Sequence, residues 1–130
     1  MGVIAADTTF LIDWSGGKGE TKRAVRDFLA AHARETFAVC LTALGEFAAG
    51  FGDPEHHALA AVRRNFSNLA SDEDVAMTYR EVFRFLKARG QLIGANDLWI
   101  ACHAVRHGLP CVTRNAEEFR RVPGLAVLTY

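Results

Sequence analysis

The chain has 130 residues, half of them apolar, which is enough to build one hydrophobic core without disulfide or metal crosslinks. Its 15 basic and 15 acidic residues balance, so there is no strong overall field to gather polyanions, and a nucleic acid would have to be held locally. No segment approaches the roughly 20 apolar residues that a membrane-spanning helix requires. We therefore expect a single domain over residues 1–130 and a soluble, cytoplasmic protein.

The first third of the chain predicts two buried strands separated by helical segments. The short apolar run Gly2–Ala6 ends abruptly at Asp7, which is typical of a strand covered on both faces and indicates the first, central strand. Residues 8–14 predict a short helical turn, and residues 20–34 have the spacing of an amphipathic helix. Residues 37–41 form a second continuous apolar run and predict a second buried strand.

The middle of the chain predicts mainly helices. Thr42 is expected to cap the helix that follows the second strand, and residues 55–65 predict another helix after a Gly and Pro break. A minor strand is expected at 67–70. Ser71 and Asp72 are both candidate caps for a long helix that ends at Gly90.

The last third predicts a helix at 95–107, a strand at 111–113, a helical turn at 116–120 and a final strand at 126–128. Strands that alternate with helices imply crossover connections, and therefore a parallel sheet covered on both faces. The fold class is α/β, a three-layer α/β/α sandwich with a central parallel sheet of four to five strands.

The three cysteines, Cys40, Cys102 and Cys111, lie in apolar runs without the CxxC spacing of a metal or redox site. Buried free thiols in a reducing compartment are favoured over a disulfide or a zinc site.

Acidic side chains follow several different strands of the predicted sheet. Asp7 comes directly after the first strand, Glu46 lies one turn into the helix after the second, and Asp97 opens the helix at 95–107. Asn115 and Glu118 follow the strand at 111–113. Because ligands of open parallel sheets bind beyond the carboxyl ends of the strands, these side chains are expected to meet there.

Structural roles remain open for most of these residues. Asp7 is also placed to be an N-cap, Asp97 to be favoured by a helix dipole, and Asn115 with Glu118 to form a capping box. Glu46 is harder to explain this way, because it lies one position too late for a capping box and has apolar neighbours.

Carboxylates that are forced together repel one another, and cations compensate for that repulsion. Oxygen ligands without paired His or Cys favour Mg²⁺ or Mn²⁺ over zinc. Such a site can polarise a phosphodiester and lower the pKa of a bound water, which suits in-line hydrolysis without a covalent intermediate.

Four segments, in order and over nearly the whole chain, resemble the motifs of PIN domains. They are ADTTFLID at 6–13, LTALGE at 41–46, IGANDLWIA at 93–101, and VTRNAEEF at 112–119 with the tail VPGL at 122–125. In chain length and in the residues of its motifs, the sequence most resembles VapC-type toxins of toxin–antitoxin pairs. The resemblance implies a Mg²⁺- or Mn²⁺-dependent endoribonuclease that acts on RNA, forms homodimers and is inhibited by a cognate antitoxin whose carboxyl-terminal segment enters the active-site groove.

By this resemblance Asp7, Glu46 and Asp97 take the core metal-ligand and catalytic roles, and Glu118 is a further candidate ligand. Asn115 stands where many family members have Asp, which leaves the ligands of a second metal open.

Other polar residues near the expected site are candidates for substrate binding or support. They are Thr8, Thr113, Arg114 and Asn115. Arg114 is suited to clamp a phosphate, although a solvated surface arginine is the alternative. Basic residues on two helices are candidates for contacts with the RNA backbone, although charged outer helix faces are routine: Lys22, Arg23, Arg26, Arg63 and Arg64.

Two competing functions remain. A metal-dependent phosphohydrolase of small phosphate esters would use Asp7 as a nucleophile, but position 9 is Thr rather than a second Asp. A non-catalytic PIN-like module, inactive through Asn115, would bind RNA or a protein without cleaving it.

Overall fold

The computed structural model describes residues 2–130 and contains a five-stranded parallel sheet with helices on both faces. The strand order is β3-β2-β1-β4-β5, so the first strand is central, as the sequence predicts. The strands are β1 (Val3–Ala6), β2 (Thr36–Val39), β3 (Phe66–Asn68), β4 (Cys111–Val112) and β5 (Val127–Leu128). The helices are α1 (Thr8–Gly16), α2 (Gly19–Ala31), α3 (Leu41–Ala48), α4 (His57–Asn65), α5 (Glu73–Ala88), α6 (Ala95–Arg106) and α7 (Ala116–Phe119).

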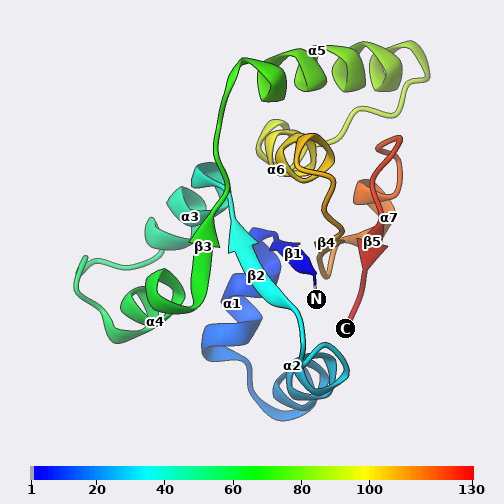
Figure 1. Cartoon of the computed structure of the whole chain (residues 1–130). Coiled ribbons are helices and arrows are strands. Elements are labelled where there is room, and N and C mark those ends of the chain that lie inside the picture. The colour runs from blue at the N-terminus through cyan, green and yellow to red at the C-terminus, as the bar shows by residue number, and fades with distance from the viewer. Residues whose placement is uncertain (1) are drawn as a thin grey trace.

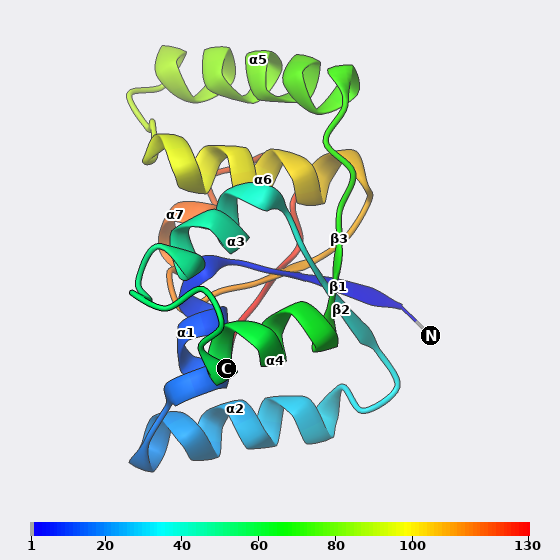
Figure 2. The same ribbon diagram turned by 90° about the vertical axis from the view of Figure 1, so that its left-hand side faces the viewer.

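The helices form two layers around the sheet (Figures 1 and 2). Helices α1, α2 and α4 lie on one side of the strands, and α5 packs on α6 on the other side. Helix α3 bridges the layers, since it contacts both α1 and α6. The three-layer α/β/α architecture expected from the sequence is confirmed.

The register of the central strands aligns their carboxyl ends. Ala6 of β1 pairs with Val112 of β4, so the next residues, Asp7 and Thr113, leave the sheet side by side. On the other side of β1, Ala5 pairs with Ala38 of β2. In Figure 2 the end of β1 and the beginning of α6 lie on the same side of the molecule. This edge holds the acidic residues.

The core is built on β1 and the first turn of α1. Phe10 is fully buried, and its ring contacts the rings of Phe28, Phe37, Phe66 and Tyr130. Each of these aromatic side chains removes a large apolar area from water. Because Phe10 is three residues after Asp7, this packing fixes the start of α1 and the direction in which Asp7 points.

Local capping differs from the prediction at one helix and agrees at another. The N-cap of α3 is Cys40, without a side-chain hydrogen bond, so the prediction that Thr42 caps this helix is wrong. Of the two candidate caps of α5, Ser71 and Asp72, Asp72 is the one that serves, because its carboxylate accepts from Val75 N at 3.0 Å. Gly90 after that helix has a φ of 65°. A Cβ is disfavoured in that left-handed conformation, which explains the glycine.

The three cysteines are buried and free, as expected. Burial raises the thiol pKa of each of them, reaching about 12 for Cys102. Within residues 2–130, no helix has the length and apolar character needed to cross a membrane.

Candidate active site

Asp7 lies between the end of β1 and the beginning of α1, and only 1% of its surface is exposed. Its Oδ1 accepts a hydrogen bond from the backbone N–H of Phe10 at 2.9 Å, so it is the N-cap of α1. The hydroxyl groups of Thr9 and Thr113 donate to the same carboxylate. Asp7 is therefore held in one orientation by neutral donors from two separate segments.

Glu46 is exposed on α3 and joins two other elements at the same edge. Its Oε1 accepts from the Thr8 hydroxyl at 2.6 Å, and its Oε2 accepts from the side-chain amide of Asn96 at 3.0 Å. Thr8 begins α1, and Asn96 lies in the first turn of α6 beside Asp97. These contacts bring Glu46 toward the starts of both helices.

Asp97 is half-buried in the first turn of α6 and faces the loop after β4. The side-chain amide of Asn115 donates to Glu118 Oε2 at 3.1 Å and makes a longer contact of 3.5 Å with Asp97 Oδ2. The backbone N–H of Asn115 donates to Thr113 Oγ1 at 2.8 Å. Asn115 makes no side-chain cap bond to α7, so the capping box that was the structural alternative for Asn115 and Glu118 does not form. Its amide instead connects two carboxylates.

The carboxylates interact electrostatically. Burial raises the pKa of Asp97 to about 6, and the negative charges of Asp7, Glu46 and Glu118 add to that rise. Burial likewise raises the pKa of Asp7, although its hydrogen bonds oppose the effect. At neutral pH Asp97 is mostly ionised and adds its charge to that of its acidic neighbours, and a cation placed among these groups would relieve their repulsion.

The ligand chemistry of this edge fits a hard divalent cation in kind and in charge. The available donors are the carboxylate oxygens of Asp7, Glu46, Asp97 and Glu118, a set that suits Mg²⁺ or Mn²⁺. No group of three His, Cys, Asp or Glu side chains in residues 2–130 has already closed into a metal-binding arrangement. Glu46 is turned instead toward Thr8 and Asn96.

The family model of the PIN domain matches residues 4–125. This range includes all four carboxylates described above, Asp7, Glu46, Asp97 and Glu118. The chain belongs to the PIN-domain family. The resemblance inferred from the four motifs is thereby confirmed.

Relatives in sequence carry ribonuclease names. Ribonuclease VapC1 of Methanocaldococcus jannaschii is 27% identical over 128 residues, covering 98% of this chain and 86% of that protein. Ribonuclease VapC1 of Haemophilus influenzae strain R2866 is 40% identical over 57 residues, which is 44% of this chain and 42% of that protein. The crystal structure of DNA-bound VapBC from Salmonella typhimurium contains a chain that matches with a TM-score of 0.81 and 27% identity, covering 99% of this chain and 98% of that one.

This PIN domain contains a second buried aspartate that the sequence analysis did not single out. Asp13 on α1 is 6% exposed, and both of its oxygens accept from Arg114 Nη1, at 3.1 and 3.0 Å. The hydroxyl of Tyr130 donates to Asp13 Oδ2 at 2.6 Å. The one available signal was an acidic residue with apolar neighbours on both sides, Ile12 and Trp14, since a charge in such a place needs a partner.

The PIN fold thus gathers most of the predicted residues at one edge. Hydrogen bonds or mutual charge effects connect one group of these residues: Asp7, Asp97, Thr113, Asn115 and Glu118. Beside them, Thr8 donates a hydrogen bond to Glu46. The guanidinium group of Arg114 is paired with Asp13.

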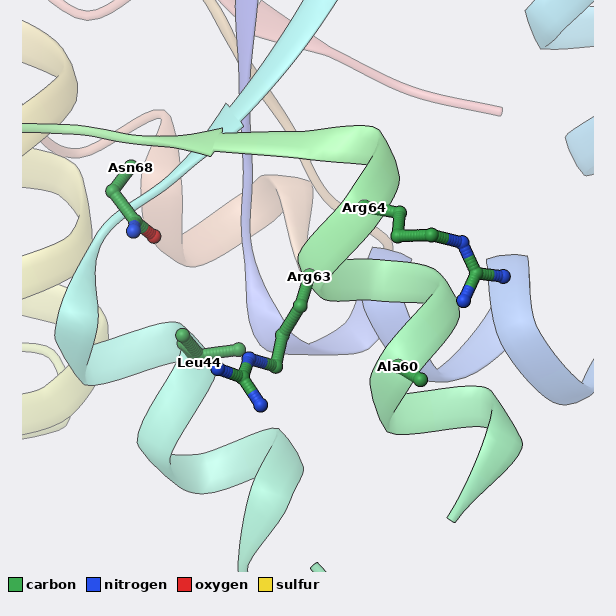
Figure 3. A pocket seen from close by; sticks show the side chains of 5 residues that line it. All are labelled: Leu44, Ala60, Arg63, Arg64 and Asn68. Carbon is green, nitrogen blue, oxygen red and sulfur yellow. The ribbon is translucent and has the colours of Figure 1, made fainter. Parts of the chain in front are cut away.

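Two arginines that were candidates for RNA contacts lie elsewhere. Arg63 and Arg64, in the last turn of α4, line a cavity of about 430 Å³ with Leu44, Ala60 and Asn68. Figure 3 shows that the two guanidinium groups diverge, with that of Arg63 directed toward Leu44. They do not form one joint phosphate site, and contact of either with RNA stays a prediction.

Proposed function

We propose that this PIN domain is a metal-dependent endoribonuclease and the toxin of a VapBC-type toxin–antitoxin system. The observation that carries the proposal is the gathering of four carboxylates from separate segments at one edge, held by hydrogen bonds to Thr8, Asn96, Thr113 and Asn115. Burial raises the pKa of Asp97 there, and the charges of its three acidic neighbours add to that rise. A fold does not maintain such crowding for stability, because each added carboxylate makes ionisation of the others less favourable. The ribonuclease names of the relatives agree with this interpretation.

In this proposal Asp7, Glu46 and Asp97 are the catalytic metal ligands, with Glu118 as a further ligand. A bound Mg²⁺ or Mn²⁺ would polarise the scissile phosphate, generate a hydroxide nucleophile near neutral pH and stabilise the leaving oxygen. Asp7 is the best oriented of the four, because its three kinds of donor fix both of its oxygens.

Four neighbours support the ligands. Thr113 fixes Asp7, and Thr8 fixes Glu46. The amide of Asn115 bridges Asp97 and Glu118 by donating toward both. Groups that orient metal ligands commonly affect metal affinity or activity by about 10- to 100-fold. Arg114 acts mainly as a support residue, since one end of its guanidinium group is held by Asp13, while its exposed part remains available to RNA.

The partners follow from the same proposal. RNA is the substrate, and a cognate antitoxin protein covers the acidic edge until the toxin is released. VapBC complexes such as that from Salmonella typhimurium provide the precedent for a bound partner. We further propose that the chain acts in the cytoplasm, as one domain over residues 1–130 and as a homodimer.

Cleavage of RNA by the purified protein tests the proposal. Structured and single-stranded RNAs are incubated with Mg²⁺, Mn²⁺ or EDTA, and the ends of the products are identified. We expect metal-dependent cleavage that leaves a 5′-phosphate and a 3′-hydroxyl, because water rather than the ribose hydroxyl attacks. The exposed residue Asp27 on α2 provides a matched control, Asp27→Asn.

Absence of cleavage of every RNA would contradict the proposal, as would equal cleavage by wild type and Asp97→Asn. RNA binding that persists unchanged in EDTA and in Asp97→Asn, without cleavage, would instead support a non-catalytic binding module. Release of phosphate from small esters, with RNA left intact, would support a phosphohydrolase.

A further inference from the structure

Asp13 lies on the same face of α1 as Thr9, one helical turn further along, and both residues contact Arg114. Thr9 Oγ1 accepts from the backbone N–H of Arg114 at 3.0 Å, while Asp13 takes the guanidinium group. Thr9 also donates to Asp7. One helix face therefore holds both the backbone and the side chain of a residue located more than a hundred positions later in the chain.

The segment held in this way carries the groups that orient the carboxylates. Thr113, immediately before Arg114, donates to Asp7, and Asn115, immediately after it, donates toward Asp97 and Glu118. The strand β4 that precedes this segment has only two residues, so the sheet by itself gives the segment little support. A shift of Arg114 would move both neighbours.

Tyr130, which follows β5 at the end of the chain, completes the arrangement on the same side of the sheet as α1. Its ring packs against Phe10 in the core with a centroid distance of 5.2 Å, and its hydroxyl donates to Asp13. Burial, followed by the hydrogen bond to Asp13, raises the pKa of Tyr130, so the hydroxyl keeps its proton at physiological pH. Asp13 is thus held by one cation and one neutral donor, and its charge is compensated within the protein.

We propose that Asp13, together with Arg114 and Tyr130, is a positioning residue for the ribonuclease site, which sets Thr113 and Asn115 against the carboxylates. This inference rests on the proposed function for its catalytic consequence but not for its structural one. Asp13 does not touch the metal ligands. It acts through Arg114, and it is the α1 anchor for the loop between β4 and α7.

The direct test compares wild type with Asp13→Asn, Tyr130→Phe and the control Asp27→Asn in the metal-free protein. The amide resonances of Thr113 and the side-chain amide of Asn115 are followed by NMR, and the affinity for Mn²⁺ is then measured by calorimetry. We expect Asp13→Asn to shift these resonances and to weaken Mn²⁺ binding by about 10-fold. Tyr130→Phe should act in the same direction with a smaller effect, and Asp27→Asn should have none.

Kinetics with a short RNA separates positioning from substrate contact. Asp13→Asn should lower kcat by about 10-fold with little change in KM, and Arg114→Lys should recover part of the activity that Arg114→Ala loses. The proposal is overturned if Asp13→Asn and Tyr130→Phe only lower Tm and leave the resonances, Mn²⁺ affinity and kcat unchanged. It is also overturned if Arg114→Ala raises KM while Asp13→Asn changes nothing, because Arg114 would then be an RNA contact.

The two proposals fail in different ways. If wild type cleaves no RNA, the proposed function is wrong, while the resonances of Thr113 and Asn115 still decide whether Asp13 positions them. If Asp13→Asn does not fold, Tyr130→Phe provides the same comparison, since it removes one donor and leaves the ion pair intact.

Discussion

Asp7 and Asp13 belong to the same helical segment and are both buried, with 1% and 6% of their surfaces exposed. They differ in the groups that surround their negative charges. Asp13 has the guanidinium group of Arg114 and the hydroxyl of Tyr130. Asp7 is surrounded by hydroxyl and backbone donors and faces further carboxylates, with Arg114 only a minor influence on its pKa. The comparison shows that this fold can supply a cation to a buried aspartate, and that it does not do so at the acidic edge.

The largest expected effect comes from neutralising Asp97, the carboxylate with the most acidic neighbours at this edge. Asp97→Asn should reduce RNA cleavage by about 1000-fold, which corresponds to about 4 kcal/mol of the barrier, because a ligand charge is removed while the shape is kept. Single-turnover cleavage of both proteins at one Mn²⁺ concentration, chosen to saturate the wild type, measures it. Loss of activity by less than about 10-fold would argue against a ligand role for Asp97.

A smaller effect is expected from the neutral groups that orient the carboxylates. Asn115→Ala removes the amide between Asp97 and Glu118, and Thr113→Val removes a donor to Asp7 while keeping the size of the side chain. Each should reduce cleavage by about 10- to 100-fold, with part of the loss recovered at high Mn²⁺. If Asn115→Ala is as active as wild type, the amide is not a support of the site.

Asp97→Asn, which should lower RNA cleavage, should also stabilise the metal-free protein. The Asn side chain carries no charge to be repelled by Asp7, Glu46 and Glu118. In EDTA at pH 7, we expect Asp97→Asn to raise Tm by about 2–5 °C. Addition of Mn²⁺ should raise Tm of the wild type more than that of the variant. A lower Tm for Asp97→Asn in EDTA would show that the charge is already compensated.

The smallest expected effect is the change with pH of the difference in Tm between Asp97→Asn and wild type. The pKa of Asp97 is about 6 in the folded protein, against a reference of 3.8, so between these values the folded state holds the extra proton. Stability of the wild type therefore declines as pH rises through this window, and the loss is complete above about pH 6. In EDTA, the Tm advantage of Asp97→Asn should be absent near pH 4 and full at pH 7. A difference independent of pH would contradict this cause.

Much of the fold was predictable because its signals are local. Continuous apolar runs identified the buried strands, and Asp72 and Gly90 marked the ends of α5 correctly. The carboxyl-edge rule for parallel sheets placed Asp7 with the residues after β4, which the register confirms. The predicted cap of α3 was wrong because β2 ends at Val39, so that α3 begins at Leu41 and Cys40 is its N-cap. Thr42 has the better intrinsic preference for a cap position but lies inside the helix.

The rest of the site could not be predicted because its signals are distant. Asp13 meets Arg114 and Tyr130 across sequence separations of 101 and 117 residues, and no spacing rule links such positions. The bond between Asn96 and Glu46 spans 50 residues and depends on how α6 packs on α3. Arg114 was considered as a phosphate clamp because it lies near the edge, and only the folded chain shows the carboxylate that holds it.

The most direct test of the account is calorimetric titration of Mn²⁺ into metal-free wild type and Asp97→Asn at pH 7.5, where Asp97 is ionised. The account predicts saturable uptake by the wild type that is lost in the variant. Absence of uptake by the wild type, or equal uptake by both proteins, would contradict the claim that the carboxylates at this edge are assembled to hold a divalent cation.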